Sequence, residues 1–207
     1  MKDIFWSEKT EFDVENRAQR PQSATSDKNN IVETTNNRVY YYSEVSRPKI
    51  LVLNKSLRNL SDNLINQAQL LSLEEPAQIY LHINSFGGSV FAGLSAVDYI
   101  QSSNVPVTTI VEGCAASAAT LMSCVGAHRQ MRSSAFMLIH QISSGLWGKY
   151  EELKDDMDNC DLFMRIIKDI YDEHTKIPKR KLNEILKRDL WFDAETCLEY
   201  GLIDEII

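Results

Sequence analysis

Residues 79–119 read IYLHINSFGGSVFAGLSAVDYIQSSNVPVTTIVEGCAASAA, and their pattern indicates the class of fold. It opens with a strand-like run at residues 79–83, turns at a pair of glycines, and continues to a second strand-like run at residues 107–111. Between the runs lies a segment with one apolar stripe, made of Val90, Leu94, Val97 and Ile100. A strand, a helix and a strand in this order indicate a parallel pair joined by a crossover helix.

The same alternation continues on both sides of this stretch. Upstream, the apolar run Ile50–Leu53 is a candidate for a buried strand, and Ser61 is a candidate N-cap for a helix that follows it. Downstream, residues 136–139 predict a further strand. We therefore predict a single α/β domain with a mainly parallel sheet.

The longest predicted helix covers about residues 149–174. One apolar seam follows it in steps of four and three, made of Leu153, Met157, Cys160, Met164, Ile167, Tyr171 and His174. Its second half carries further apolar residues outside this seam, namely Phe163, Ile166 and Ile170. Two interpretations are open: a core helix with a broad apolar face, or a helix that also packs against another subunit.

Composition excludes several classes of protein. The 207 residues suffice for one domain with its own core, and 43% hydrophobic with 25% charged residues is typical of a soluble globular protein. A net charge of −7 argues against a nucleic-acid-binding protein, which needs a basic surface. No apolar run reaches the roughly 18 residues of a membrane-spanning helix. Residues 1–12 lack the apolar centre of a secretory signal.

The cysteines and the N-terminal segment add two expectations. The four cysteines are Cys114, Cys124, Cys160 and Cys197, and they form no CxxC pair and no zinc-ligand spacing. We therefore expect free thiols in a reducing compartment and a cytoplasmic location. Residues 13–38 are poor in apolar side chains and rich in polar ones. We therefore expect residues 1–44 to be a mobile polar segment and residues 45–207 to be the compact domain.

Three short motifs carry candidate chemistry, and each has a plain structural interpretation as well. Ser117 lies among small residues at a predicted strand-to-helix junction, where small side chains also serve close helix packing. His140 follows a predicted strand, where α/β sheets place catalytic groups, although a structural histidine is equally common there. Gly87 and Gly88 permit positive φ and uncover a backbone N–H, as an oxyanion hole requires and as an ordinary tight turn also does.

Taken together, the motifs resemble the ClpP peptidases. The resemblance rests on INSFGGSVFAGLSAVDYI, VEGCAASAATL, FMLIHQ and LKRDLWFDAETCLEYGLID in this order, and it covers roughly residues 45–207. Each motif alone is modestly specific, whereas the four in this order are highly specific. The resemblance implies the ClpP/crotonase-like fold, a repeated β-β-α superhelix with a parallel sheet. It also implies a protruding handle at about residues 145–174, with a strand-forming tip at residues 145–148.

Residue by residue, the resemblance implies a serine endopeptidase. Ser117 matches the nucleophile, His140 the general base and Asp189 the acidic residue that orients the base. The backbone N–H groups of Gly88 and Ala118 match the oxyanion hole. The residues themselves favour Asp189 over the nearby Asp193, because Asp193 is well placed to cap the last helix.

The sequence also departs from the family pattern. Phe86 stands where the glycine turn usually has a proline, and Cys114 stands where a longer polar residue is frequent. Residues 1–44 do not match the family's N-terminal axial loop or propeptide.

The resemblance further implies partners. Family members form heptameric rings that stack as a homo-oligomeric tetradecamer around unfolded polypeptide, which an AAA+ ATPase supplies. The chemistry requires no metal or organic cofactor, and the chain has no G-x-x-x-x-G-K-[ST] loop, so ATP is used only by that partner. The alternatives are a non-catalytic ring or scaffold subunit, and a phage-type maturation protease of assembly proteins. A further alternative, an acyl-CoA enzyme of the crotonase fold, is disfavoured because such an enzyme needs no Ser–His pair at these positions.

Overall fold

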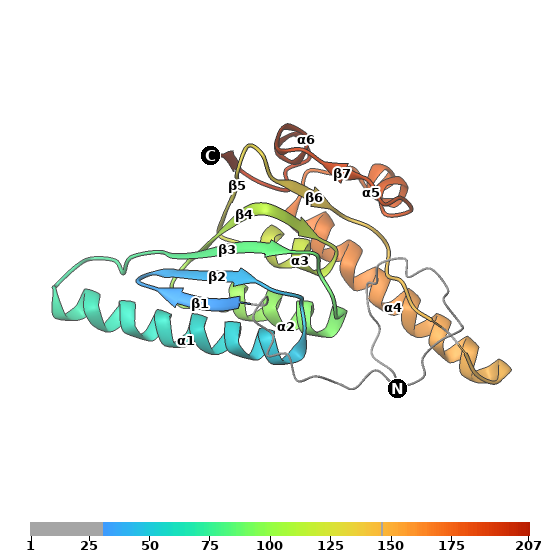
Figure 1. Cartoon of the computed structure of the whole chain (residues 1–207), viewed down its shortest axis with the longest axis horizontal. Coiled ribbons are helices and arrows are strands. Elements are labelled where there is room, and N and C mark those ends of the chain that lie inside the picture. Colours follow the sequence, from blue (N-terminus) through green and yellow to red (C-terminus); the bar gives the residue numbers. More distant parts are fainter. Residues whose placement is uncertain (1–30, 146) are drawn as a thin grey trace, which may run out of the picture.

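The computed structural model describes residues 31–145 and 147–207, which form one sheet with helices packed against it (Figure 1). The strands are β1 (Ile31–Thr35), β2 (Arg38–Tyr42), β3 (Ile79–Ser85), β4 (Val107–Ala116), β5 (His128–Met131), β6 (Phe136–Leu138), β7 (Trp191–Phe192) and β8 (Glu205–Ile206). The helices are α1 (Arg47–Leu70), α2 (Val90–Gln101), α3 (Ala118–Cys124), α4 (Tyr150–His174), α5 (Lys179–Ile185) and α6 (Ala194–Glu199).

The sheet is mainly parallel, as the sequence predicts. Its strand order is β1-β2-β3-β4-β5-β8, and every neighbouring pair in this row is parallel except the β1–β2 hairpin. Helices α1, α2 and α3 lie in the connections β2–β3, β3–β4 and β4–β5. The predicted α/β class and the strands expected at residues 79–83, 107–111 and 136–139 are therefore confirmed.

Strand β4 changes its neighbour half-way along, and this change shapes the candidate site. Residues Thr108–Val111 pair with β5, whereas Cys114–Ala116 pair with β6. Gly113 lies at the changeover with a φ of 74°, which a side chain would disfavour. Strand β6 in turn pairs antiparallel with β7, so the chain near residue 190 returns to the end of β4.

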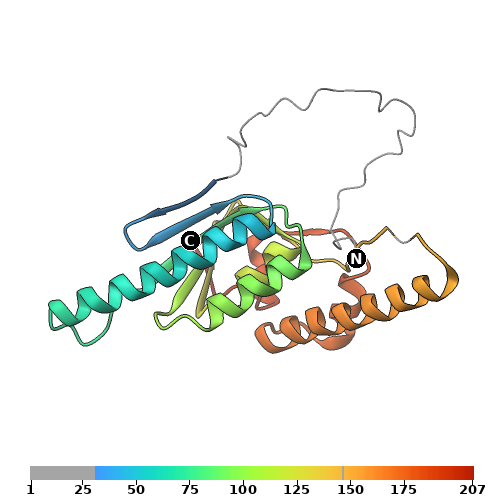
Figure 2. The same cartoon turned by 90° about the horizontal axis from the view of Figure 1, so that it is seen from below.

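The helices that cross between the parallel strands pack side by side on the sheet (Figures 1 and 2). Helix α1 contacts β1, β2 and β3, and α3 contacts β3 and β4. The core lies between these layers; its largest fully buried side chains include Leu53, Leu57, Ile79, Leu81, Ile83, Leu121 and Met122.

Helix α4 extends well beyond the body of the domain, as both views show (Figures 1 and 2). Only Ile167 and Tyr171 of this helix are buried, and both lie in its second half. Met157, a member of the predicted seam, is 52% exposed. Among the described residues, the seam is thus fully buried only in the second half of α4, where this helix contacts α3. Gly145, Trp147 and Gly148 belong to no strand, and Leu146 of the expected strand-forming tip lies outside the described residues.

The predicted strand at Ile50–Leu53 is wrong, because these residues belong to α1. Pro48 in the first turn suits a helix start, and burial follows the helical period. Ile50 and Leu53 are 2% and 0% exposed, whereas Leu51 and Val52 between them are 54% and 44% exposed. A strand would have buried alternate residues instead. The predicted N-cap Ser61 accordingly lies in the middle of α1.

The expected boundary between residues 44 and 45 also differs from the structure. Residues 31–42 form β1 and β2, and β2 pairs with β3 as an integral strand of the sheet. Val39 and Tyr41 are completely buried, so this polar-looking segment supplies core side chains at alternate positions. Residues 1–30 of the expected mobile segment lie outside the described residues.

Candidate active site

Ser117 occupies a strained position between β4 and α3. Its φ of 61° and ψ of −130° are unfavourable for a residue with a side chain, at a cost on the order of 1–3 kcal/mol. Its hydroxyl is buried and has no hydrogen-bond partner among the described residues. A buried polar group without a partner is also destabilising. Two unfavourable features at one serine point to a role in function.

The backbone brings Ser117 close to His140. Ala116 pairs with Leu138 in the parallel β4–β6 ladder, and the Ser117 N–H donates to the Leu138 carbonyl at 2.8 Å. His140 follows Leu138 by two residues. Ser117 and His140 therefore lie just past the carboxyl ends of two adjacent parallel strands, which is where α/β sheets place their ligands.

Asp189 contacts the histidine through Nδ1 of the ring. Its Oδ1 lies 3.1 Å from Nδ1 of His140. Strand β7 explains the contact, because Trp191 pairs with Leu138 and holds the preceding residues beside the end of β6. The imidazole is mostly buried at 14% exposed, whereas the carboxylate is 62% exposed. Asp193 is the N-cap of α6, as predicted, because its side chain accepts a hydrogen bond from the Thr196 N–H at 2.9 Å.

The surroundings of His140 keep its imidazole neutral. Burial lowers the pKa of His140 below the ordinary value of 6.5, and the charge and hydrogen bond of Asp189 offset only part of this effect. At neutral pH the ring therefore holds one proton. With that proton on Nδ1, facing Asp189, the buried Nε2 is a proton acceptor.

The glycine turn after β3 lies directly against Ser117. A Cβ on Gly87 would come within 2.6 Å of both the Ser117 Cβ and the Ala116 carbonyl oxygen, and the φ of this glycine is 93°. A Cβ on Gly88 would come within 2.4 Å of the Val45 carbonyl oxygen. Neither position accepts a side chain. Gly88 and Ala118, the two predicted oxyanion donors, thus lie in the turn beside Ser117 and immediately after it.

The structure therefore brings the predicted site residues to one edge of the sheet. The His140–Asp189 contact is formed, whereas the Ser117 hydroxyl makes no hydrogen bond to any described side chain. Hydrogen bonds between catalytic groups are often long before substrate binds.

A protein-family model for Clp protease matches residues 33–207. The chain belongs to the Clp protease family. Its relatives include the ATP-dependent Clp protease proteolytic subunit of Deinococcus radiodurans, which is 31% identical over 170 residues, or 80% of this chain and 83% of that protein. The ATP-dependent Clp protease proteolytic subunit 3 of Streptomyces coelicolor is 33% identical over 163 residues, or 77% of this chain and 75% of that protein.

Membership of the Clp protease family makes this chain a peptidase, which is a hydrolase. The family match begins at residue 33, inside β1, so all but the first two residues of the β1–β2 hairpin lie within the Clp protease region. Within the described residues, no cluster of three His, Cys, Asp or Glu side chains is arranged to hold a metal ion. None of the helices in the described part of this Clp protease is both long and apolar enough to cross a membrane.

Sequence reasoning missed an aromatic contact beside the site of this Clp protease. The rings of Phe86 and Trp191 meet edge to face, with centroids 6.4 Å apart. Phe86 attracts attention in the sequence as a departure from the family turn, and Trp191 lies in the same motif as Asp189. No local pattern links the two residues, because their contact depends on how β7 returns to the sheet.

Proposed function

We propose that this member of the Clp protease family is a serine endopeptidase subunit that hydrolyses peptide bonds of unfolded chains. The observation that carries the proposal is the His140–Asp189 pair at the end of β6, beside a strained serine at the end of the adjacent β4. A nucleophile, a base and a carboxylate that orients the base thus lie on neighbouring segments of the fold.

In the proposed reaction, Ser117 is the nucleophile and His140 is the general base. Nε2 of His140 takes the hydroxyl proton as Oγ of Ser117 forms a bond to the peptide carbonyl carbon. The tetrahedral intermediate then collapses, the carbon–nitrogen bond breaks, and His140 returns the proton to the leaving amine. Water attacks the acyl-enzyme by the same route and releases Ser117.

Asp189 and two backbone N–H groups assist these steps. Asp189 holds the Nδ1–H tautomer and stabilises the imidazolium that forms transiently. The N–H groups of Gly88 and Ala118 stabilise the oxyanion, a contribution of about 3–4 kcal/mol for a strong donor. The chemistry requires no metal or organic cofactor.

We propose further that the subunits form heptameric rings, stacked as a homo-oligomeric tetradecamer, and receive unfolded chains from an AAA+ unfoldase, the only consumer of ATP. The half of α4 that projects from the domain supports this proposal, because its apolar seam is incompletely covered within one chain. The four cysteines are free in the described chain, which suits the reducing cytoplasm.

The test compares wild type with Ser117→Ala. We expect assembled wild type to hydrolyse short peptides and to react with a fluorophosphonate probe, and Ser117→Ala to lose labelling and at least about 10⁴-fold in rate. Ser134→Ala is the matched control, because Ser134 is exposed and lies outside the site. Negative-stain images report the ring symmetry. Sevenfold particles of wild type that neither react nor hydrolyse peptides would instead support the scaffold alternative.

A further inference from the structure

A buried chain of hydrogen bonds links helix α4 to the backbone of Ser117. The Tyr171 hydroxyl, on α4, lies 2.5 Å from Oγ1 of Thr120, on α3. Oγ1 of Thr120 in turn donates a hydrogen bond to the Ser117 carbonyl at 2.6 Å. Both Tyr171 and Thr120 are 0% exposed. Because the single hydroxyl hydrogen of Thr120 goes to this carbonyl, the Tyr171 hydroxyl must be the donor to Oγ1 of Thr120.

These hydrogen bonds end on the peptide unit that carries one of the two proposed oxyanion donors. The Ser117–Ala118 peptide is trans, so the Ser117 carbonyl and the Ala118 N–H lie in one plane and point in opposite directions. Any group that holds the Ser117 carbonyl therefore also orients the Ala118 N–H. The Thr120 N–H donates to the same carbonyl at 3.0 Å, so Thr120 holds this peptide with two donors.

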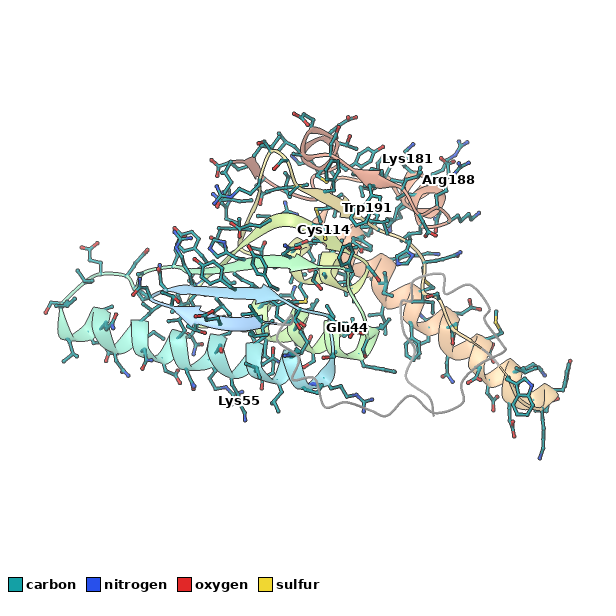
Figure 3. All side chains as sticks on the ribbon, viewed as in Figure 1. Glu44, Lys55, Cys114, Lys181, Arg188 and Trp191 are labelled. Carbon is teal, nitrogen blue, oxygen red and sulfur yellow. The ribbon has the colours of Figure 1, made fainter. Side chains whose placement is uncertain are left out.

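The strained backbone of Ser117 needs such support. Its φ is 61°, and a residue remains in an unfavourable conformation only where the surrounding contacts impose it. On one side, the Ser117 N–H donates to the Leu138 carbonyl at 2.8 Å. On the other side, Thr120 and Tyr171 hold the Ser117 carbonyl. Figure 3 labels Cys114, which lies in β4 three residues before Ser117 and marks this end of the strand.

Burial keeps the Tyr171 hydroxyl in the form that can donate. It raises the pKa of Tyr171 well above the ordinary value of 10, so the hydroxyl retains its proton throughout the neutral range. A phenylalanine at this position would fill nearly the same space but would leave Oγ1 of Thr120 without its buried donor. Packing alone therefore does not account for a tyrosine in this part of the apolar seam.

We propose that Tyr171 and Thr120 are positioning residues that fix the Ser117–Ala118 peptide in the orientation that the oxyanion hole requires. This inference rests on the proposed peptidase function and adds two residues to its site. Without this hydroxyl clamp, formed by Tyr171 and Thr120, the peptide can turn and move the Ala118 N–H away from the developing negative charge. Because that charge exists only after the nucleophile has attacked, the clamp should affect kcat and leave KM nearly unchanged.

The experiment measures kcat and KM of the assembled enzyme with a short fluorogenic peptide. We expect Thr120→Val, which keeps the shape of the side chain but removes its hydroxyl, to lower kcat about 10- to 100-fold. Tyr171→Phe should lower kcat about tenfold, with KM within about twofold of wild type. The double variant should be no slower than Thr120→Val, because Tyr171 acts through Thr120. Thr120→Ser retains the hydroxyl and should keep most of the activity.

Thr109→Val is the matched control. Thr109 is 1% exposed, and its Oγ1 donates to the Ser123 carbonyl at 2.7 Å, near the other end of the same helix. This variant loses the same kind of buried hydrogen bond, so its midpoint of urea unfolding should fall about as far as that of Thr120→Val. Its kcat should nevertheless stay within about twofold of wild type, because the Ser117–Ala118 peptide is untouched.

A peptide aldehyde tests the oxyanion hole itself. Oγ of Ser117 adds to the aldehyde carbon, and the carbonyl oxygen of the adduct occupies the place of the oxyanion. The affinity of the aldehyde should fall about tenfold in Tyr171→Phe and remain as in wild type in Thr109→Val. The acid limb of kcat/KM should be the same in all three proteins, because His140 is unchanged. A general loss of stability would not produce this combination.

Crystal structures of wild type, Thr120→Val and Thr109→Val separate this inference from the proposed function, because they report the peptide without turnover. We expect the Ser117–Ala118 peptide to turn, or to adopt more than one orientation, in Thr120→Val alone. If wild type lacks peptidase activity but the peptide turns in this way, the function fails and the clamp stands. If wild type cleaves peptides and Tyr171→Phe and Thr120→Val have the kcat of Thr109→Val, the clamp is overturned and the function stands.

Discussion

Two of the histidine–carboxylate pairs among the described residues look alike at first sight. Nδ1 of His140 lies 3.1 Å from Asp189, and Nδ1 of His82, in β3, lies 3.0 Å from Oε1 of Glu112, in β4. Burial lowers the pKa of both imidazoles, and the neighbouring carboxylate offsets part of that effect in each. Both rings are therefore neutral at pH 7 with the same carboxylate-facing nitrogen.

The pairs differ in what their surroundings allow the second ring nitrogen to do. The Arg38 guanidinium lies 2.9 Å from Nε2 of His82, and because a guanidinium only donates, this nitrogen is already used as an acceptor. Glu112 also accepts hydrogen bonds from Tyr42 at 2.6 Å and from Arg132 at 3.3 Å. The His82 pair thus ties β2, β3 and β4 together, whereas the His140 pair lies beyond the strand ends beside Ser117. A histidine–carboxylate pair alone does not identify a catalytic site.

The largest difference should appear when each histidine is removed. We expect His140→Ala to lower kcat/KM for a short peptide by about 10⁴- to 10⁶-fold, since it removes the proposed base. The proposed oligomeric rings should still assemble. His82→Ala should keep kcat/KM within a few-fold per folded subunit but lower the free energy of unfolding by about 1–3 kcal/mol. Peptide hydrolysis and urea unfolding of both variants measure these two effects. Equal losses of activity would show that the two histidines do not differ in function.

Replacing each carboxylate by an amide should distinguish the two pairs in the same way, with smaller effects on kcat/KM. Asp189→Asn should reduce kcat/KM by about 10²- to 10⁴-fold, because the amide no longer favours the correct tautomer or the imidazolium. Glu112→Gln should leave kcat/KM nearly unchanged and destabilise the domain by about 1–3 kcal/mol through its weakened bonds to Tyr42 and Arg132. The idea fails if Glu112→Gln lowers activity per folded subunit as strongly as Asp189→Asn does.

The pH dependence should follow His140 alone. The proposed base acts only when neutral, so activity is present above its pKa and is lost as the pH falls through it. Because burial lowers that pKa, the acid limb of kcat/KM should have its midpoint below 6.5. In Asp189→Asn the limb should move lower still, since the carboxylate raises the pKa. Glu112→Gln should shift only the His82 titration, followed by NMR, and a shifted activity profile in that variant would contradict this assignment.

The smallest effect is expected at Arg38. Arg38→Met removes the hydrogen bond to His82 and the contact of the guanidinium with the Tyr80 ring, which lies 4.6 Å away. We expect a loss of about 1 kcal/mol in unfolding free energy and unchanged kcat/KM per folded subunit. Arg180→Met is the control, because this side chain is 95% exposed. If the two variants have equal free energies of unfolding, Arg38 does not stabilise the domain through its hydrogen bond to His82.

Much of the fold was accessible from local pattern, and the failures have a physical cause. The strand at residues 79–83, the helix after it and the cap at Asp193 follow from periodicity and turn chemistry. Ile50–Leu53 was misread because a run of four apolar residues fits a strand or a helix until the exposed Leu51 and Val52 are seen. Strand β2 escaped notice because its three consecutive tyrosines show no alternation of polar and apolar side chains, although alternate residues of the strand are buried.

The α/β class, the family resemblance and the three proposed catalytic side chains could all be predicted from the sequence, because they depend on periodicity and on motifs confined to short stretches. The tertiary structure brought His140 into contact with the predicted Asp189, paired His82 with Glu112 and placed Phe86 against Trp191. Such contacts depend on strand register, on the change of partner along β4 and on the return of β7. Long-range pairing sets these geometries, and no local run of residues encodes it.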